Sequence, residues 1–346
     1  MRAAVITRQG SPVTPNVELV ADWPEPTPAA GEVRVQTEAS ALNHLDLWVG
    51  RGLPGFDFTY PRISGSDGVG IVDAVGPGVD DAWMGRRVVL NACVPQPEAA
   101  HPDRDPAAPD IRMIGEHDPG TMAASFVAPA SNLVAIGDTD PVAAAAFALT
   151  HLTAWRMLAT RAGLQAGQTV LITGIGGGVA LALLNIARHF GATTIVTSRH
   201  RWKLERALEL GADHGILDEG EDWSRAVREL TGRRGVDICA DSIGKAVHLP
   251  CIKSLVRGGT FVTCGTTTGP DATTDLSRVF WNQLSIVGST MGSMVEFRQV
   301  MSLLVRGHLH PVIDEVYDMD AVADAFGKLE GGEQFGKLVV RWSDGT

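Results

Sequence analysis

The sequence has few cysteines and no long apolar run. Its 346 residues include four cysteines, none of which forms a C-x-x-C pair, so neither a disulfide framework nor a thiolate zinc knot is expected. No run of 18 apolar residues occurs, and the opening residues, MRAAVITRQG, lack the apolar core of a signal peptide. These absences predict a cytoplasmic protein without a membrane partner.

Positive charge is also scarce. Lys and Arg number 29 against 40 Asp and Glu, which gives a formal net charge of −11. Most of the surface would repel phosphate, so nucleic acid is not expected as a partner and any anion site must be local. With 45% hydrophobic and 20% charged residues, a chain of this length is expected to form about two globular domains.

One stretch, residues 168–203, combines a strand, a glycine-rich turn, a helix and a second strand. Thr169 to Thr173 has the length and the β-branched content of a buried parallel strand. Four glycines follow within five residues, and apolar residues then recur at helical spacing from Val179 until Gly191, where a cap is expected. A second β-branched run at residues 193–197 completes a βαβ unit.

The glycine turn predicts a dinucleotide site. Gly174, Gly177 and Ala180 stand three apart, which is a variant of the dinucleotide fingerprint with Ala in the last position. Where side chains are absent, backbone N–H groups can approach a pyrophosphate, and the helix dipole favours the same anion. The alternative is a glycine-rich turn in an unrelated α/β domain. The expected contacts are Gly174, Gly176, Gly177, Gly178 and Val179.

The end of the second strand predicts which dinucleotide binds. NAD-binding units usually carry Asp or Glu about 20 residues after the glycines, and this chain has no acid there. Ser198, Arg199 and Lys203 instead place a hydroxyl and two cations where a ribose phosphate needs them. We therefore predict NADPH or NADP⁺ as the cofactor. Alternatively these cations, together with Arg201, only decorate the start of the next helix.

The rest of the chain predicts an α/β protein with two kinds of domain. Residues 1–130 contain short β-prone runs between Pro and Gly, which suits a small antiparallel, barrel-like domain. From residue 202 to 265 helices and strands alternate, which predicts a doubly wound parallel sheet. Residues 91–120, rich in proline and mixed charge, predict an exposed excursion, and residues 336–341 predict a strand that returns to the first domain.

Two loops are expected at the carboxyl edge of the parallel sheet, where ligands of such sheets bind. They are residues 241–244 and 264–268, and ordinary sheet-end turns are the alternative. The expected cofactor contacts in them are Ser242, Ile243, Cys264, Gly265 and Thr266.

Several strings, in order along the chain, resemble the medium-chain dehydrogenase/reductase superfamily. Besides the nucleotide unit they are GSDGVGIVDAVGPGV at 65–79, LTHLTAW at 149–155 and EQFGKLVVR at 333–341. The resemblance implies a GroES-like β-rich catalytic domain, formed by residues 1–135 and 275–346, around a Rossmann nucleotide-binding domain of residues 136–274. Members usually pair through the nucleotide domain, so a homodimer or homotetramer is expected, with the apolar strand 284–290 as its edge.

This chain departs from the ligand pattern of the zinc enzymes in that superfamily. They carry Cys where this chain has Asn43, His-Glu where it has Ser66 and Asp67, and a further ligand near Leu149. Their relay hydroxyl falls on Leu45. Because the thiolate and imidazole ligands are missing, we predict no metal. The metal-free branch, similar to quinone oxidoreductases and enoyl reductases, has the N-x-x-D motif that this chain begins at Asn43.

The resemblance implies that NADPH delivers hydride to a quinone or an enone, because an activated acceptor needs no metal to take charge on oxygen. Asn43 is a candidate donor to the carbonyl oxygen, or else a turn residue that fixes local backbone. Asp46 is expected to act more as a hydrogen-bond anchor than as an acid catalyst. Thr153 resembles a threonine near the nicotinamide or the substrate, or it bonds back to its own helix.

Four further residues match positions of interest in relatives. His44 resembles a contact of the cofactor phosphates, and Lys337 resembles a contact of the adenosine or nicotinamide side. Tyr60 and His151 are candidates for the substrate pocket. The alternatives are a structural histidine for His44, a surface lysine for Lys337, a loop anchor for Tyr60 and simple packing for His151.

Two other functions remain open. One is an alcohol dehydrogenase or ketone reductase with an unusual metal site made of Asp67, Ser66 and either His44 or His151. The other is a nucleotide-binding sensor or structural protein without turnover.

Overall fold

The computed structural model describes residues 1–96 and 110–342, and the chain forms two compact units. The first unit contains residues 1–149, 293–305 and 311–346, and the second contains residues 150–292 and 306–310. The predicted boundaries, 135/136 and 274/275, differ from this division. Residues 275–292 belong to the second unit because their strand pairs with its sheet, and residues 136–149 belong to the first.

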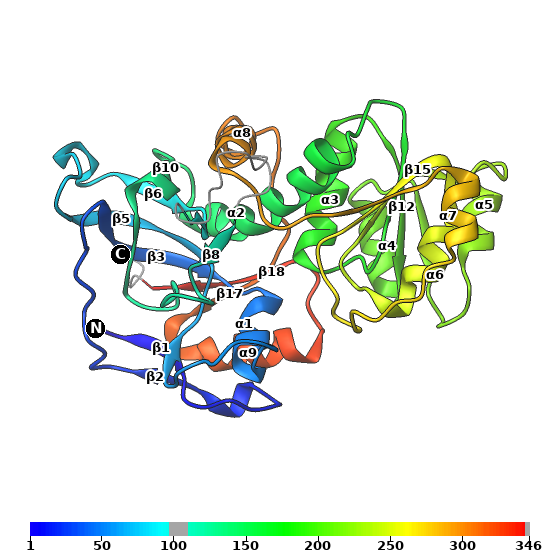
Figure 1. The fold of residues 1–346 in the computed structure, drawn as a ribbon. Helices are drawn as coiled ribbons and strands as arrows, with labels where there is room; N and C mark the ends of the chain where they lie inside the picture. The colour runs from blue at the N-terminus through cyan, green and yellow to red at the C-terminus, as the bar shows by residue number, and fades with distance from the viewer. Residues whose placement is uncertain (97–109, 343–346) are drawn as a thin grey trace. The chain divides into compact units, whose positions relative to one another are not determined.

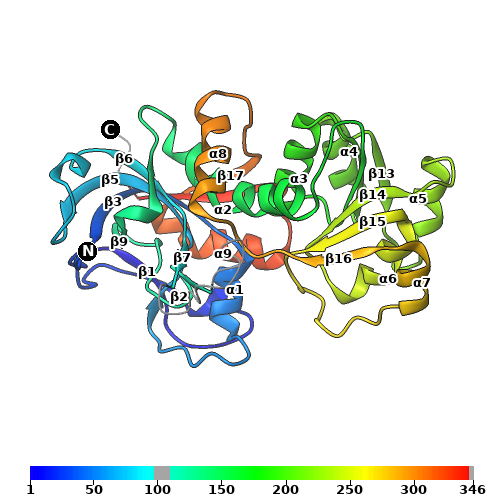
Figure 2. The ribbon, with the colours of Figure 1, turned by 45° about the horizontal axis from the view of Figure 1, so that its top comes forward.

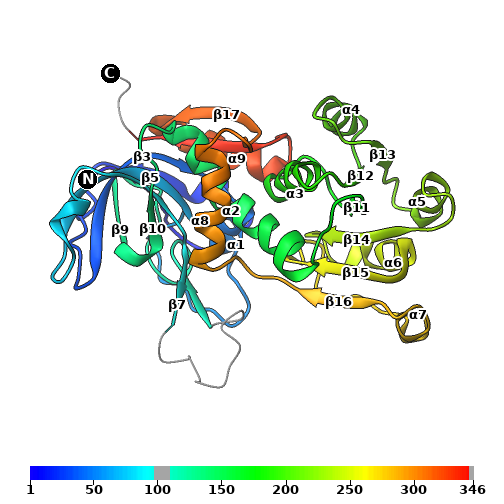
Figure 3. The same cartoon turned by 90° about the horizontal axis from the view of Figure 1, so that it is seen from above.

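The second unit is built on a six-stranded parallel sheet (Figure 3). The strand order is β13-β12-β11-β14-β15-β16, so the order reverses between β11 and β14, as the predicted doubly wound fold requires. In β12 only the first residue is exposed, which fits a strand that is covered on both faces. The strands are β11 Thr169–Ile172, β12 Thr193–Ser198, β13 His214–Leu217, β14 Val236–Asp241, β15 Leu255–Thr263 and β16 Ser285–Gly288.

Helices cover both faces of this sheet. Helices α3 and α4 pack against β11, β12 and β13, whereas α5 packs against α6, and α6 packs against β14 and β15. The buried core includes Leu171, Ile195 and Phe261. The expected strand 284–290 is present as β16, which forms one edge of the sheet (Figure 2). The helices are α3 Gly178–His189, α4 Arg201–Glu209, α5 Ser224–Leu230, α6 Lys245–Ser254 and α7 Leu276–Asn282.

The first unit is built on a largely antiparallel sheet whose strands come from both ends of the chain. Its path is β10-β6-β5-β3-β18-β17, with β9 also paired to β3. The last strand, β18, lies antiparallel to β3, with Val339 opposite Ala41 (Figure 1). The predicted return of the tail to the first domain is therefore confirmed. The sheet strands are β3 Glu32–Ala41, β5 Asp67–Val75, β6 Arg87–Leu90, β9 Ser125–Pro129, β10 Leu133–Ala135, β17 Ile313–Asp318 and β18 Lys337–Arg341.

Smaller elements complete the first unit around a core that includes Ile6, Leu47 and Phe326. A second sheet has the order β2-β1-β4. Helix α1 was not predicted, although its sequence carries a capping signal that is described below. These elements are β1 Ala3–Ile6, β2 Val17–Val20, β4 Arg62–Ile63, α1 His44–Arg51, α8 Met294–Val305 and α9 Val322–Gly331.

The predicted excursion at residues 91–120 lies partly outside the described residues, which omit 97–109. Its described ends form a hairpin of β7 Cys93–Pro95 and β8 Ile111–Met113, in which Cys93 pairs with Met113. Both of these side chains are buried. The expectation that the excursion is exposed is therefore wrong at its base.

A long apolar helix, α2 Pro141–Trp155, passes from the first unit into the second and continues as a π-helical segment, η5 Arg156–Arg161. By length and composition alone it could cross a membrane, but 78% of its most apolar window is buried within the protein. It has the burial of a core helix.

Candidate functional site

The predicted glycine turn lies where the strand order of the second unit reverses. It connects β11 to α3, and its first two glycines have positive φ, +65° at Gly174 and +120° at Gly176. Side chains disfavour that conformation. A Cβ on Gly174 would also lie 2.7 Å from Cδ1 of Ile243. The local fold thus requires glycine at this point.

The backbone of the turn is held by β12. The N–H of Ile175 donates to the carbonyl of Thr197 at 2.8 Å, and the N–H of Gly174 faces the Thr197 hydroxyl at 3.3 Å. Beyond the turn, the first N–H groups of α3 have no partner within the helix, and they present the positive end of its dipole. The residues present therefore fit a dinucleotide pyrophosphate.

A buried carboxylate joins this turn to the loop after β14. Asp241 accepts hydrogen bonds from the Thr173 hydroxyl at 2.6 Å, from the Ile243 N–H at 3.1 Å and from the Gly244 N–H at 2.9 Å. Burial raises the pKa of Asp241, although these hydrogen bonds oppose the rise. The loop after β15 is tied on in turn, because the Thr268 N–H donates to the Ile243 carbonyl at 2.8 Å.

The structure thus brings together the predicted contacts in three loops. Gly174 lies against Ile243. The backbone N–H of Cys264 donates to the backbone carbonyl of Asp241, and the Thr267 hydroxyl donates to the Ser242 carbonyl. Contact of these loops with the cofactor, and of the intervening Gly265 and Thr266, stays a prediction.

The residues expected to read the ribose phosphate differ in how they are held. Arg199 is exposed and makes no hydrogen bond or ion pair with another described residue. The Ser198 hydroxyl accepts the His200 N–H at 3.1 Å. Lys203 is buried, with its ammonium nitrogen 5.2 Å from the centre of the Trp202 ring. Arg199 is therefore the most available cation of the predicted set.

In the first unit, four polar side chains form a buried cluster. Asn43 is 9% exposed, Asp46 1%, Asp67 0% and Lys337 4%. Asn43 and Asp46 come from the junction of β3 and α1, Asp67 opens β5 and Lys337 opens β18. Because β5 and β18 are the two neighbours of β3 along the sheet path, three adjacent strands deliver the cluster.

The Lys337 ammonium is at the centre of this cluster. It donates to Oδ2 of Asp67 at 2.9 Å, to Oδ1 of Asn43 at 2.6 Å and to the Leu42 carbonyl at 2.7 Å. An ammonium has three protons, and each has an acceptor here. The alternative of a surface lysine is wrong, because Lys337 is buried, and its expected contact with the cofactor stays a prediction.

Asp67 is satisfied at both of its oxygens. Oδ1 accepts the Leu149 N–H at 2.8 Å, and Oδ2 accepts Nδ2 of Asn43 at 2.8 Å in addition to Lys337. Removing one partner of such a buried ion pair typically costs about 3–5 kcal/mol, because the other charge is left uncompensated.

Asp46 anchors the backbone on either side of the cluster. Its carboxylate accepts the Asn43 N–H and the Gly65 N–H, each at 2.7 Å. Burial raises the pKa of Asp46 to about 6, against the opposing effect of these two bonds and of Lys337. At neutral pH it is mainly ionised and accepts both bonds. These contacts agree with the expected role of Asp46 as a hydrogen-bond anchor. The bond from the Asn43 N–H to the Asp46 carboxylate is part of the capping box that starts α1.

The donor groups of this cluster do not fit a zinc ion. Ser66 directs its hydroxyl to the Ile114 carbonyl at 2.7 Å, Leu149 supplies only an N–H, and the Asp67 carboxylate is bonded to an ammonium. Zinc in proteins is bound chiefly by thiolate, imidazole and carboxylate. Within residues 1–96 and 110–342 no group of three His, Cys, Asp or Glu is arranged to hold a metal.

The remaining predicted residues are spread over both units. Thr153 and His151 lie in the second, where Thr153 directs its hydroxyl to the sulfur of Met291 at 3.8 Å and His151 is buried. His44 is exposed at the start of α1. The Tyr60 hydroxyl donates to the Val49 carbonyl at 2.5 Å, which is the loop-anchor alternative.

Sequence reasoning missed that Asp67 and Lys337 form a pair. It treated Asp67 as a possible metal ligand and Lys337 as a cofactor contact. The available signal was the predicted return of residues 336–341 to the first domain, which brings a lysine to a strand beside an acid.

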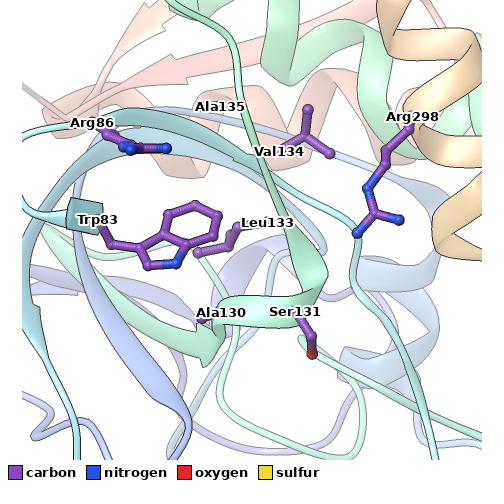
Figure 4. Close-up of a pocket in the computed structure, with 8 residues that line it drawn as sticks. All are labelled: Trp83, Arg86, Ala130, Ser131, Leu133, Val134, Ala135 and Arg298. Atoms are coloured by element: carbon purple, nitrogen blue, oxygen red, sulfur yellow. The ribbon is translucent and has the colours of Figure 1, made fainter. Parts of the chain in front are cut away.

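A pocket of about 480 Å³ lies elsewhere in the first unit (Figure 4). The Trp83 ring and Arg86 lie on one side of it, and Arg298 of α8 lies on the other. Arg86, Arg298 and the lining residue Ser131 are exposed, so its polar groups are not pre-oriented toward a ligand. None of the predicted site residues lines it.

Two family models of known proteins match successive parts of the chain. Residues 29–138 match the alcohol dehydrogenase GroES-like domain, and residues 178–306 match the family described as zinc-binding dehydrogenase. The chain is 31% identical to a zinc-type alcohol dehydrogenase-like protein, YogA, of Leptosphaeria maculans, over 91% of this chain and 92% of that one. The chain belongs to the medium-chain dehydrogenase/reductase superfamily, with a GroES-like and a Rossmann domain.

Other similar proteins differ in their stated activities. A 2-haloacrylate reductase of a Burkholderia species is 32% identical over 70% of this chain and 66% of its own. The solved structure of an NAD-dependent alcohol dehydrogenase is 38% identical, with a TM-score of 0.90 over 99% of each chain. A crotonyl-CoA carboxylase/reductase in complex with NADP is 25% identical, with a TM-score of 0.88 over 99% of this chain and 94% of that one. The superfamily therefore defines an oxidoreductase, and the substrate is not fixed by likeness alone.

Two glycine substitutions distinguish a structural from a ligand-binding role in the turn. Gly174→Ala should lower the free energy of unfolding by about 1–2 kcal/mol, because alanine disfavours its positive φ. Gly177→Ala should change it by less than about 1 kcal/mol, since its φ is −78° and a Cβ there meets nothing within 4 Å.

Urea unfolding and NADPH titration measure the two effects. We expect Gly177→Ala to weaken NADPH binding although the protein stays stable, because the added methyl enters the space that the pyrophosphate needs. Unchanged NADPH affinity in that variant would place the pyrophosphate elsewhere.

Proposed function

We propose that this protein is an NADPH-dependent reductase of quinones or α,β-unsaturated carbonyl compounds that works without a metal ion. The observation that carries the proposal is the contact of the Lys337 ammonium with Asp67 and Asn43, at the positions where zinc relatives have their ligands. A second support is the pair of relatives whose names state a haloacrylate and a crotonyl-CoA substrate.

The choice of acceptor follows from where negative charge develops. NADPH, when bound, supplies the hydride. A saturated ketone would localise the charge on one oxygen, which a metal or a proton relay normally stabilises, and the relay position here is Leu45. A quinone or enone delocalises the charge, so its reduction asks less of the protein.

Asn43 is the proposed donor to the acceptor oxygen. One proton of its Nδ2 is held by Asp67 at 2.8 Å, but the other faces the Ala41 carbonyl at 3.4 Å, near the limit of a hydrogen bond. This second N–H can donate its hydrogen bond to a substrate oxygen instead, and little is lost because the bond to Ala41 is weak. Lys337 fixes the amide in this orientation by holding its oxygen.

A broad acceptor assay tests the function. Chelator-treated protein should oxidise NADPH with a naphthoquinone or with cyclohexenone, and should oxidise it far more slowly with cyclohexanone. Alcohol oxidation that disappears on chelation would support the alcohol dehydrogenase alternative. Tight NADPH binding without turnover on any acceptor would support the sensor.

Replacement of Asn43 by alanine tests the donor role. Loss of one such donor typically lowers kcat by about 10²-fold or more, so Asn43→Ala should reduce kcat much more than NADPH affinity. Ser66→Ala is the matched control, because its hydroxyl bonds only the Ile114 carbonyl. An unchanged kcat in Asn43→Ala would leave Asn43 with only its capping role.

NADPH is proposed over NADH because the end of β12 presents an exposed arginine and no acid. Arg199→Ala should weaken NADPH binding by about tenfold or more, as expected for loss of a charge-assisted hydrogen bond, and should leave NADH binding unchanged. Arg201→Ala is the matched control on the neighbouring helix. Titration of both reduced cofactors measures this, and equal losses for NADPH and NADH would contradict it.

We also propose that the second unit forms the dimer interface. Helix α7 has no buried residue, and it exposes Leu276, Phe280 and Trp281 at 74%, 69% and 71% beside the free edge of β16. Such an apolar patch next to an unpaired strand fits a second copy of the chain.

Trp281→Glu should convert the dimer to a monomer in sedimentation analysis, and a monomeric unmodified protein would contradict the proposal.

A further inference from the structure

The three acceptors of Lys337 form a cation site of their own. Oδ2 of Asp67, Oδ1 of Asn43 and the Leu42 carbonyl oxygen converge on the ammonium nitrogen at 2.9, 2.6 and 2.7 Å. One carboxylate, one amide and one backbone carbonyl are oxygen ligands of the kind that hard divalent cations take in proteins. Asp67 and Asn43 are held by further hydrogen bonds. Leu42 directly follows β3, and its N–H donates to the Leu338 carbonyl.

We propose that Lys337 is the built-in cation of this site, so that a divalent ion binds there only when the lysine is removed. The inference rests on the metal-independent function proposed above and names the group that replaces the metal. Lys337 neutralises Asp67, which is fully buried, and at the same time sets the orientation of the Asn43 amide.

The buried charge of Asp67 determines what can occupy this site. A buried carboxylate without a partner is too costly to remain ionised, so it must pair, protonate or take up a cation. Asp67 also accepts the Leu149 N–H and the Nδ2–H of Asn43, so both of its oxygens are held in position. Removal of the ammonium by truncation therefore leaves a negative, oxygen-lined cavity that favours a cation such as Ca²⁺ or Mn²⁺ over a thiolate-preferring metal.

The experiment uses the full chain, dialysed against chelator and then titrated with Ca²⁺, Mn²⁺ or Zn²⁺. Bound metal is measured by elemental analysis and stability by Tm. The unmodified protein should bind no metal at this site, with no change in Tm. Lys337→Ala should have a lower Tm, bind one divalent ion per chain and regain part of the lost Tm on binding.

Two controls isolate the charge. Lys337→Ala combined with Asp67→Asn should lose the metal response, because the cavity is then neutral. Lys245→Ala, which removes the lysine of an exposed ion pair with Asp271, should show neither a metal-dependent Tm nor a stoichiometric ion. Lys337→Ala that stays folded and binds no ion would overturn the proposal, as would a metal response that persists in the double variant.

Failure of the inference and failure of the proposed function give different results. A stoichiometric metal in the unmodified protein, with activity lost on its removal, would contradict both. Metal-free reductase activity together with an unresponsive Lys337→Ala would contradict the inference alone. If Lys337→Ala does not fold, it is refolded with and without Ca²⁺ or Mn²⁺: recovery only with the ion supports the proposal, and recovery in neither condition contradicts it.

Discussion

The ion pair between Lys337 and Asp67 is the interaction on which the first unit depends. It joins the opening residues of two strands that flank β3, and it includes the junction of β3 and α1 through Leu42 and Asn43. A buried pair of charges stabilises a fold only if the remaining donors and acceptors are also satisfied. Here every proton of the ammonium and both oxygens of the carboxylate have partners, so the sheet, the helix start and the charges fix one another.

The second unit uses a buried acid in a comparable way, with a hydroxyl and two backbone N–H groups as its partners. Asp241 is hydrogen-bonded by Thr173 and by the backbone of Ile243 and Gly244, which ties the glycine turn to the next loop at the carboxyl edge. In each unit a buried carboxylate thus holds in position the backbone or side chains of predicted site residues. In the first unit the acid holds an amide in position, and in the second it holds Thr173, which directly precedes the glycine turn of the predicted dinucleotide site.

Local patterns predicted the second unit well, because each βαβ step lies within about 30 residues of sequence. The glycine turn and the doubly wound parallel sheet followed from such patterns. Helix α1 was missed because Asn43 and Asp46 were interpreted as a family motif, although the same letters form a capping box. The domain boundary was placed too early because residues 275–292 were assigned with the tail, whereas β16 pairs with β15 in the sheet of the second unit. The pairing of Lys337 with Asp67 was missed because the two residues lie 270 positions apart, and no local pattern reports such a pairing.

The position of β18 in the sequence has a consequence for how the protein is made. The ribosome synthesises Asp67 270 residues before Lys337, so the carboxylate has no counter-charge while the intervening chain emerges. Strand β3 pairs with β5, β9 and β18, and of these three partners β18 is synthesised last, near the end of the chain. The sheet of the second unit, in contrast, comes from one continuous segment and can close before the tail is translated. The sheet of the second unit can therefore form before the sheet of the first unit is complete.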